Sequence, residues 1–521
     1  MVANESAVIP LRETSPAEIV RLPIRAGVWT WTVLFFLAFS TRLIAAFILP
    51  NAEQDGYSYA EIITRWSSDL STGHFRLTDL FGFWLPLFQL ATAVPNIWIG
   101  NSLLAGKIVS ALCGAVSCLL VFAITKRLTR SVFLACLGFA FLVSSPLHVL
   151  YSAACMTDVP EGCLILASLW FVTQRRWVLA AIFGALAEGV RVEPWVLVIV
   201  LPLLQLAYER RISMLSLAIL LLPPLVWLGV GELATGDPLA FLAKRARYQA
   251  SYMDFYLTRH GFTFADVRQD IEYFLLGANR GVVLAGIAAG VLSISQAVRR
   301  HRLPPLAVTA ILGYAVALCG FIFFAYLTKR QPVLFPRYGL IFFSLGLPLL
   351  LWLFQYSFRP SMLSWIPKLL SVVAMAICLW EATRQLPIIS KVFADYRAHR
   401  LIAEMLATAF QQSPNFDQRC FSDDAAVRVL SRLPADRFLR SETTVPSAKR
   451  DASSFESYLH QEHVRFLVYM NIEDSLPAKF YPELRHNAQA DTGIFQFVAF
   501  APSPFAADVG LFRLRDNNKA R

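Results

Sequence analysis

The sequence has little charge for its length, since Asp, Glu, Lys and Arg make up only 16% of its 521 residues. Hydrophobic residues make up 56%, and the mean hydropathy is +0.52. Water-soluble proteins of this size rarely combine so little charge with so high a hydropathy. This composition excludes a soluble globular enzyme and predicts a chain that crosses a membrane several times.

The sequence also lacks cysteine pairs in its polar C-terminal part and lacks histidine patterns that bind metals. Of the eight cysteines, only Cys420 lies in the polar C-terminal part, and no CxxC pattern occurs. His74 and His148 belong to no HxxH or HExxH pattern. A disulfide framework is therefore excluded, and these two histidines are interpreted as polar loop or interface residues.

Lys and Arg outnumber Asp and Glu by 47 to 36, which gives a formal net charge of +11, but the basic residues are not clustered in one part of the sequence. Nucleic acid is therefore not expected as a partner. The first apolar segment is not expected to be a cleavable signal peptide, because it is long, carries Arg42 near its far end and has no clear small-residue cleavage site. That segment is expected to remain as a membrane anchor.

What the sequence does contain is a series of apolar segments. Roughly 17 to 25 such residues can cross the hydrocarbon core of a bilayer as a helix, and about eleven segments approach that length. They lie near residues 28–49, 104–124, 131–149, 159–174, 177–190, 194–208, 212–233, 281–298, 303–326, 337–356 and 369–385. The fourth to sixth are short and closely spaced. The predicted fold is an α-helical polytopic membrane protein.

Lys and Arg in the short connections predict the orientation. If the segments alternate, the basic clusters all fall on one side of the membrane: Arg12, Arg21 and Arg25; Lys126, Arg127 and Arg130; Arg175 and Arg176; Arg210 and Arg211; Arg299, Arg300 and Arg302; Arg359 and Lys368. That side is expected to be cytoplasmic, in a bacterial inner membrane. Residues 1–27 then form a cytoplasmic segment, 28–385 a membrane domain and 386–521 an extracytoplasmic domain, with outward loops at 50–103, 234–280 and 327–336.

Acidic residues gather on the predicted outer face. The stretch EQDGYSYAE carries Glu53, Asp55 and Glu61 directly after the first apolar segment. Asp55 could simply cap a helix that starts there, or it could be a functional carboxylate. Further along the chain, Asp158 stands between two apolar segments, and Arg191 and Glu193 occupy a tight turn between two others. Charges at such positions need partners or a polar cavity, so both structural ion pairs and a functional site remain open.

Basic residues on the same face run against the positive-inside pattern. Lys244 and Arg280 lie in the loop at 234–280, while Lys329, Arg330 and Arg337 lie at the start of the tenth apolar segment. Such cations require anions, which either lipid headgroups or the phosphate of a lipid-linked substrate could provide. Two separate clusters that face carboxylates favour phosphate recognition.

The order of these motifs resembles that of a known superfamily. They are EQDGYSYAE, SSPLHVLYSAACMTDVPEG, GALAEGVRVEPWVL, ATGDPLAF and FPRYGL, spread over roughly residues 28–385. This order resembles the GT-C superfamily of membrane glycosyltransferases. It is most similar to glycosyltransferase family 39, the protein mannosyltransferases that use dolichyl-phosphate-mannose, and to bacterial transferases that modify lipid A. The resemblance implies that a sugar moves, with inversion, from a polyprenyl-phosphate donor to a hydroxyl of a lipid, glycan or protein on the outer face.

The resemblance also implies roles for residues. The key carboxylate of the first outward loop matches Asp55, but Gly56 follows it where the protein mannosyltransferases have an adjacent Asp-Glu, so a share for Glu53 stays open. Asp55 is expected to be the catalytic base, and Asp158 to orient the acceptor or help hold a divalent ion. Glu53 and Asp55 could coordinate Mg²⁺ or Mn²⁺. The donor and pocket residues expected from the same motifs and basic loops are Glu53, Tyr57, Arg191, Glu193, Lys244, Arg280, Lys329, Arg330, Arg337 and Tyr338.

Two further regions carry structural expectations. Segment 81–103 is apolar but interrupted by Pro86 and Pro95, so interfacial helices are expected rather than a span. The tail from 386 combines a helical pattern at 396–412 with β-like runs at 464–470, 494–500 and 510–515, which predicts a small α/β domain. Asp423 and Asp424 precede an apolar periodic run and are expected to cap a helix there.

Two other classes of function compete with an enzyme. A polytopic transporter or flippase of lipid-linked sugars would also keep charges in a membrane domain, and a non-catalytic assembly protein could retain a transferase scaffold. The enzyme is favoured because the candidate residues lie on outward loops and no inverted internal repeat is visible. Membrane lipids are expected to surround the protein in every case.

Overall fold

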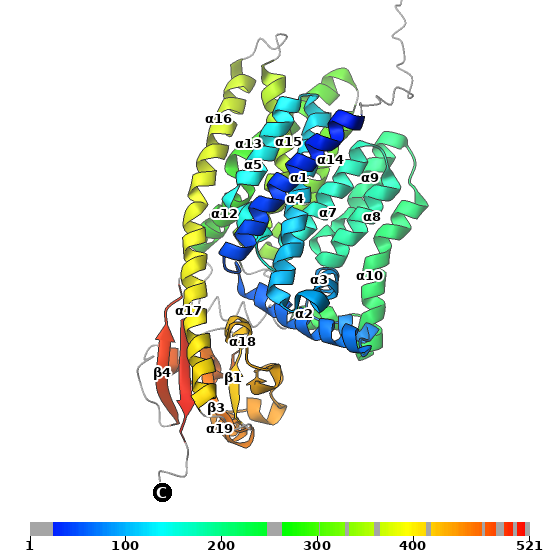
Figure 1. Ribbon diagram of the computed structural model, residues 1–521. Helices are drawn as coiled ribbons and strands as arrows, with labels where there is room; N and C mark the ends of the chain where they lie inside the picture. Colours follow the sequence, from blue (N-terminus) through cyan, green and yellow to red (C-terminus); the bar gives the residue numbers. More distant parts are fainter. Residues whose placement is uncertain are drawn as a thin grey trace, which may run out of the picture.

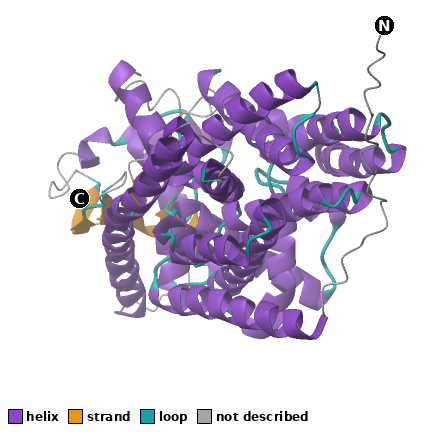
Figure 2. Ribbon diagram, turned by 90° about the horizontal axis from the view of Figure 1, so that it is seen from above, coloured by secondary structure: helices purple, strands orange, loops and turns teal. Residues whose placement is uncertain are grey.

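The computed structural model describes residues 24–246, 263–301, 303–328, 333–358, 365–412, 418–470, 475–485, 494–503 and 508–515. A bundle of long helices forms most of the molecule, and a smaller domain with a β-sheet lies beyond one end of it (Figure 1). Seen along the bundle, the strands lie together on one side of the helices (Figure 2). The predicted fold class, a polytopic helical protein with a small C-terminal α/β domain, is confirmed.

All eleven predicted apolar segments are helical. The helices of the membrane part are α1 (Ile24–Ile48), α2 (Gln54–Thr72), α3 (Leu87–Ile99), α4 (Ser102–Thr129), α5 (Val132–Ser144), α6 (Pro146–Ser152), α7 (Asp158–Thr173), α8 (Trp177–Val190), α9 (Leu197–Glu209), α10 (Met214–Thr235), α12 (Phe264–Ala278), α13 (Arg280–Arg300), α14 (Leu306–Leu327), α15 (Pro336–Ser357) and α16 (Trp365–Arg384).

Not all of these helices reach spanning length. Within the described residues seven helices are long and apolar enough to cross a membrane, or eight if α5 and α6, bent by 64° at Ser145, count as one span. The helices α7, α8 and α9 have 16, 14 and 13 residues, fewer than the roughly 20 that a full span needs. These are the three segments that the sequence shows as short.

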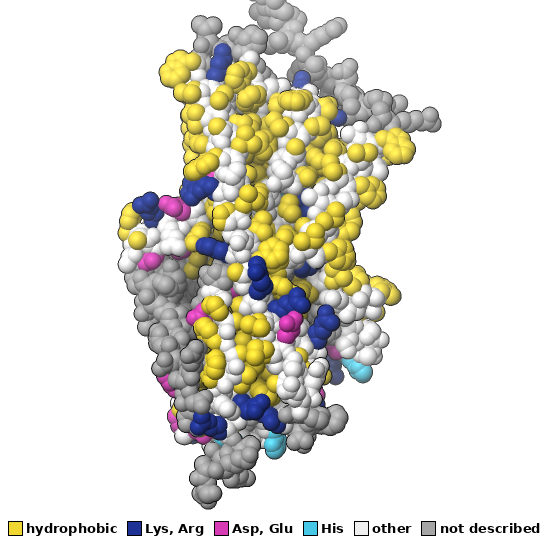
Figure 3. Space-filling view, turned by 60° about the vertical axis from the view of Figure 1, so that its left-hand side comes forward, with side chains coloured by type: hydrophobic (Ala, Val, Ile, Leu, Met, Phe, Trp, Pro, Cys, Tyr) yellow, Lys and Arg dark blue, Asp and Glu magenta, His cyan; other side chains and the backbone are white. Residues whose placement is uncertain are grey.

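The surface of the bundle is suited to lipid. Apolar side chains such as Trp29, Phe47, Val291 and Phe324 are exposed on its outer helices. Hydrophobic side chains cover most of the bundle surface that one face presents, and most of the charged side chains in that view gather nearer the C-terminal domain (Figure 3). A surface divided in this way is expected where a bilayer surrounds one part of a protein and water the other.

The helices α2 and α3 lie across the end of the bundle that faces the C-terminal domain (Figure 1). Tyr59, Ile63 and Trp66 of α2 pack against Phe88 and Ala93 of α3 in one buried cluster. With 13 residues, α3 is about 20 Å long, which is too short to cross a bilayer. The expectation that segment 81–103 does not span is therefore consistent with its length.

The C-terminal domain hangs from one long helix. The helix α17 (Leu386–Gln412) follows α16 almost without interruption and leads into the sheet (Figure 1). The C-terminal domain continues with β1 (Arg419–Ser422), α18 (Ala425–Ser431), β2 (Phe438–Leu439), α19 (Ala452–Gln461), β3 (Val464–Met470), α20 (Leu476–Phe480), β4 (Phe495–Ala501) and β5 (Val509–Leu514).

The sheet has the strand order β2-β1-β3-β5-β4 in the described residues. The strands β2, β1 and β3 are parallel, whereas β5 pairs antiparallel with both β3 and β4. Side chains of β3 alternate between two cores: Phe466 and Val468 pack with α17, and Leu467 and Tyr469 pack with α19. Both faces of β3 are thus buried, as its run of apolar residues requires.

Three of the five strands, β3, β4 and β5, match the predicted β-like runs. Asp424 caps α18 as predicted, since its Oδ1 accepts a hydrogen bond of 3.0 Å from Val427 N. The strands β1 and β2 have four and two residues and leave too short a pattern in the sequence to be recognised.

Candidate active site

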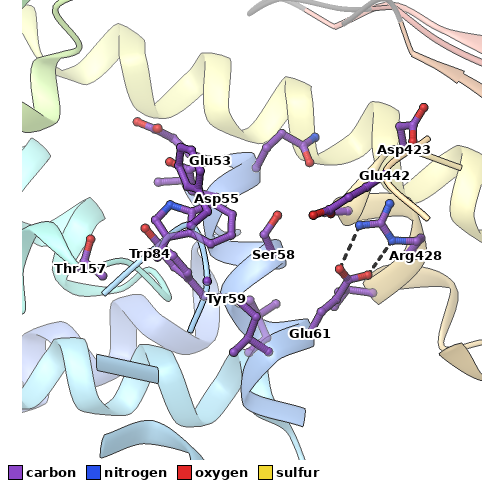
Figure 4. Close-up of a pocket in the computed structure, with 18 of the residues that line it drawn as sticks. Glu53, Asp55, Ser58, Tyr59, Glu61, Trp84, Thr157, Asp423, Arg428 and Glu442 are labelled. Carbon is purple, nitrogen blue, oxygen red and sulfur yellow. Dashed lines mark hydrogen bonds and ion pairs between the residues drawn. The ribbon is translucent and has the colours of Figure 1, made fainter. Parts of the chain in front are cut away.

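A cavity of about 3150 Å³ lies between the end of the bundle and the C-terminal domain. Its walls come from α2, the segment at 81–85, the start of α15, α17 and α18. Figure 4 shows that Glu53, Asp55 and Tyr59 lie on one side of it, and that Glu61, Arg428 and Asp423 lie on the other. The volume exceeds the roughly 300–1,000 Å³ of ordinary small-molecule pockets, so two substrates have room to meet.

The acidic motif forms the beginning of α2. Glu53 is the N-cap residue, but its side chain makes no cap hydrogen bond, and Asp55 lies in the first turn. The interpretation of Asp55 as the N-cap is therefore wrong. A Cβ atom on Gly56 would lie only 2.6 Å from the Cys155 carbonyl oxygen and 2.1 Å from Asn51 Nδ2. This close approach explains why glycine follows Asp55.

Arg337, at the start of α15, joins the two carboxylates. Its Nη1 lies 2.5 Å from Glu53 Oε2, and its Nη2 lies 2.9 Å from Asp55 Oδ2. The Tyr151 hydroxyl donates a hydrogen bond of 2.5 Å to Glu53 Oε1. The side chain of Arg337 is 8% exposed, whereas that of Asp55 is 35% exposed. Asp55 is therefore the partner that can most easily leave the arginine.

A second arginine lies beside the first. Arg191 contacts three carboxylates: Asp158 at 3.0 Å, Glu161 at 3.1 Å and Glu193 at 2.6 Å. The ring of Tyr338 lies between the two arginines, with its centroid 5.3 Å from the Cζ atom of Arg191 and 5.4 Å from that of Arg337. A cation over a tyrosine ring is attracted by its π electrons, so Tyr338 helps to hold both guanidinium groups.

The carboxylates respond differently to these surroundings. Burial raises the pKa of Glu53 from its ordinary 4.5 to about 7, although Arg337 acts in the opposite direction. Burial also opposes ionisation of Glu193, but Arg191 outweighs it and lowers the pKa of Glu193 to about 2. Glu53 can therefore change its charge near neutral pH, while Glu193 stays ionised.

Asp158 does not reach the cavity. It is 6% exposed and lies behind the wall, where Oδ1 is 3.0 Å from Arg191 Nη1 and 4.0 Å from Arg337 Nε. Asp158 thus links the two arginine groups. This position does not suit the predicted contact with an acceptor, because a substrate in the cavity would meet the arginines first.

The other predicted residues divide into three groups. Arg191, Glu193, Lys244, Arg337 and Tyr338 line the cavity with Glu53 and Asp55. Arg280 does not line it and pairs with the buried Glu381 of α16, while Tyr57 is buried against Ala425 and Ala426 of the C-terminal domain. Lys329 and Arg330 lie outside the described residues.

Sequence reasoning missed Tyr59, Tyr151 and Glu161. Glu161 lies three residues after Asp158, which places both on one face of a helix, so the spacing could have revealed it. Tyr151, in contrast, contacts Glu53 from 98 positions away, and no local pattern signals that pair.

The residues present do not fit a divalent metal. In the described part of the chain, no group of three or more His, Cys, Asp and Glu side chains is arranged to hold one. Glu53 and Asp55, the predicted ligands for Mg²⁺ or Mn²⁺, both face the guanidinium of Arg337 instead. No step of the chemistry proposed below therefore runs through a metal.

Comparisons with known proteins point to one fold. No family model matches the chain, and no curated protein matches it either. Among solved structures, ArnT from Cupriavidus metallidurans bound to undecaprenyl phosphate matches with a TM-score of 0.53 and 14% identity, over 94% of this chain and 97% of that one. The same protein in its apo state gives a TM-score of 0.52 and 14% identity, over 93% and 98%.

The chain has the fold of ArnT. ArnT is a GT-C glycosyltransferase that modifies lipid A, so the resemblance seen in the sequence is confirmed as a likeness of fold. The match covers nearly the full length of both chains, which means that the C-terminal domain belongs to the shared ArnT-like architecture. At 14% identity the likeness shows the fold and leaves the chemistry to be argued from the residues of this chain.

Proposed function

We propose that the chain is an integral membrane glycosyltransferase. It transfers a sugar, with inversion at the anomeric carbon, from a polyprenyl-phosphate-linked donor to a hydroxyl of a lipid, glycan or protein acceptor on the extracytoplasmic face. One observation carries this proposal: Glu53, Asp55 and Arg337 meet in a large cavity at the end of an apolar bundle with the ArnT fold. ArnT itself is known with undecaprenyl phosphate bound.

Arg337 is assigned to the donor phosphate. A guanidinium suits phosphate because its planar fork offers two parallel donors. In the structure both ends of that fork face carboxylates, so a phosphate must replace at least one of them. Asp55 is the more exposed of the two partners, and its release would free a carboxylate beside the bound donor.

The released Asp55 is assigned as the catalytic base. The acceptor oxygen bonds to the anomeric carbon while the bond from that carbon to the phosphate oxygen breaks. The hydroxyl proton passes to Asp55, and the electron pair of the broken bond stays on the polyprenyl phosphate, where Arg337 stabilises the added charge. A phosphate leaves without protonation, so one base and one cation suffice.

The other charged residues around Asp55 and Arg337 are assigned to holding these two side chains in place. Asp158 contacts both arginines from behind the cavity wall, and Arg191 is fixed by Glu161 and Glu193. We assign them to positioning, with Tyr338 between the guanidinium groups. Aromatic residues on another wall, among them Phe83, Trp84 and Phe241, offer flat apolar surfaces for a sugar ring or an isoprenoid chain.

The experiment is a transfer assay with the purified full-length protein in lipid nanodiscs and a panel of radiolabelled polyprenyl-phosphate sugars. Release of free polyprenyl phosphate that depends on an added membrane extract as acceptor is the expected result. The variant Arg337→Gln should raise the donor KM by at least about tenfold, because it removes the phosphate fork. In sealed proteoliposomes, movement of intact donor across the bilayer without any cleavage would instead identify a flippase and contradict the proposal.

A further inference from the structure

One face of α2 is turned towards the C-terminal domain, and its residues Gln54 and Glu61 line the cavity across from Asp55, together with Arg428. Gln54, Tyr57 and Glu61 follow the spacing i, i+3 and i+7, which places them in one stripe along the helix. Gln54 Oε1 accepts a hydrogen bond of 3.3 Å from Ala426 N, and Tyr57 packs on Ala425 and Ala426. The stripe therefore meets α18 along nearly two turns.

The strongest contact in this stripe is an ion pair. Arg428 Nε and Nη2 lie 2.6 and 2.9 Å from the two oxygens of Glu61, a bidentate arrangement that Figure 4 shows in dashed lines. The side chains are 7% and 20% exposed. Arg440 adds a contact of 3.3 Å to Glu61 Oε2. An arginine fork on a carboxylate fixes direction as well as distance.

Arg428 is itself fixed by a hydrogen bond to the sheet of the C-terminal domain. Its Nη1 donates a hydrogen bond of 2.8 Å to the carbonyl of Ser422, the last residue of β1. The strand β1 lies inside the parallel part of the sheet, between β2 and β3. A rigid connection thus runs from the sheet through Arg428 and Glu61 to α2, and Asp55 lies six residues, or about 9 Å, along that helix.

We infer that Arg428 is a positioning residue, which sets the orientation of α2 from the C-terminal domain so that Asp55 faces the reacting atoms. The inference rests on the proposed function for its catalytic part. The helix α17 already links the C-terminal domain covalently to the bundle, so the ion pair is not needed to keep the domain attached. Its contribution is to fix the orientation of α2. A buried charge pair is a poor stabiliser compared with apolar packing, but it is well suited to fixing one arrangement.

The experiment compares full-length variants in nanodiscs by hydrogen exchange and by transfer kinetics. In Arg428→Gln we expect faster amide exchange over residues 54–72, unchanged exchange in α4, and a kcat lower by about 10- to 100-fold with a donor KM within about twofold of wild type. Arg428→Lys keeps the charge without the fork and should fall between the two. Glu462→Gln is the matched control, since it breaks an ion pair with Arg419 in the same domain without touching α2.

Several results would overturn the inference. Exchange over residues 54–72 that is unchanged in Arg428→Gln would do so, as would equal effects from Glu462→Gln. If Arg428→Gln does not fold, Glu61→Gln removes the same pair and leaves the sheet intact, and the same outcomes apply. Faster exchange in α2 together with a wild type that transfers no sugar would support the holding of α2 by Arg428 and contradict the proposed transfer reaction, so the two failures can be told apart.

Discussion

At the scale of single residues, Glu53 is the group whose charge is most sensitive to its surroundings. Burial raises its pKa to about 7, against the attraction of Arg337. A carboxylic acid with a raised pKa in the folded protein binds protons that the unfolded chain has already lost between about pH 4.5 and 7. The stability that this group contributes is therefore present at low pH and falls as the pH rises through that window.

This sign leads to a prediction for Glu53→Gln, which resembles the protonated form. Wild type should lose thermal stability between pH 5 and pH 8 relative to Glu53→Gln, because only wild type must ionise a buried carboxyl. Thermal unfolding in detergent at the two pH values measures the difference. Parallel pH dependence of the two proteins would show that burial does not raise the pKa of Glu53 into this range and would contradict the prediction.

Some residues of the candidate site could be predicted from the sequence, and others could not. The motif order was sufficient to select Glu53, Asp55, Arg191 and Arg337, and the structure brings all four to one cavity. It could not separate Tyr57 from Tyr59, because the face that a helix turns to a cavity depends on what packs against its other sides. Glu61 and Arg428 meet across 367 positions, which no local spacing can reveal.

At the scale of secondary structure elements, α12 and α15 approach each other at two glycines. A Cβ atom on Gly339 would lie 2.3 Å from Ala278 N and 2.4 Å from the Phe274 carbonyl oxygen, and one on Gly277 would lie 1.8 Å from the Pro336 carbonyl oxygen. These neighbours are backbone atoms and cannot turn away as a side chain could. Glycine permits the contact, and the contact fixes the start of α15, which carries Arg337.

Gly339→Ala is therefore predicted to separate the two helices. We expect a loss of about 1–3 kcal/mol in stability, seen as a lower unfolding midpoint, and a higher donor KM as Arg337 is displaced. Gly286→Ala in α13 serves as the control, since a Cβ atom there meets nothing within 4 Å. An unchanged midpoint and KM in Gly339→Ala would show that the close approach of α12 and α15 does not position Arg337.

At the scale of the whole molecule, the cavity and the basic clusters lie at opposite ends of the helical bundle. The helices α4, α7 and α15 all start beside the cavity, which Ser102, Thr157 and Pro336 line, so their other ends lie far from Asp55. Arg127 near the far end of α4 donates a hydrogen bond of 3.0 Å to the carbonyl of Thr173 at the end of α7. Lys126 and Arg127 at the end of α4, and Arg175 and Arg176 after α7, are thus separated from the cavity by the length of the bundle.

This arrangement predicts the topology in the membrane. A periplasmic reporter such as alkaline phosphatase should be active when fused after residue 521 and inactive when fused after residue 301, which follows the basic end of α13. The opposite pattern would place the cavity in the cytoplasm and contradict a reaction on the outer face.

The sequence carries much of this architecture because membrane helices and positive-inside residues leave long, local signals. It carries less about the C-terminal domain, where β1 and β2 are short and gain their stability from pairing with β3. The position of Asp158 behind the cavity wall also depends on how α7 and α15 pack against each other, and that packing is a property of the assembled bundle.

The most direct measurement is the rate of sugar transfer by Asp55→Asn beside Asp436→Asn, which removes an exposed carboxylate of the C-terminal domain that does not line the cavity. The proposed role of Asp55 predicts that Asp55→Asn lowers kcat by at least about 10²-fold, while Asp436→Asn keeps the wild-type rate. Transfer by Asp55→Asn at the wild-type rate would contradict the assignment of the base and with it the proposed mechanism.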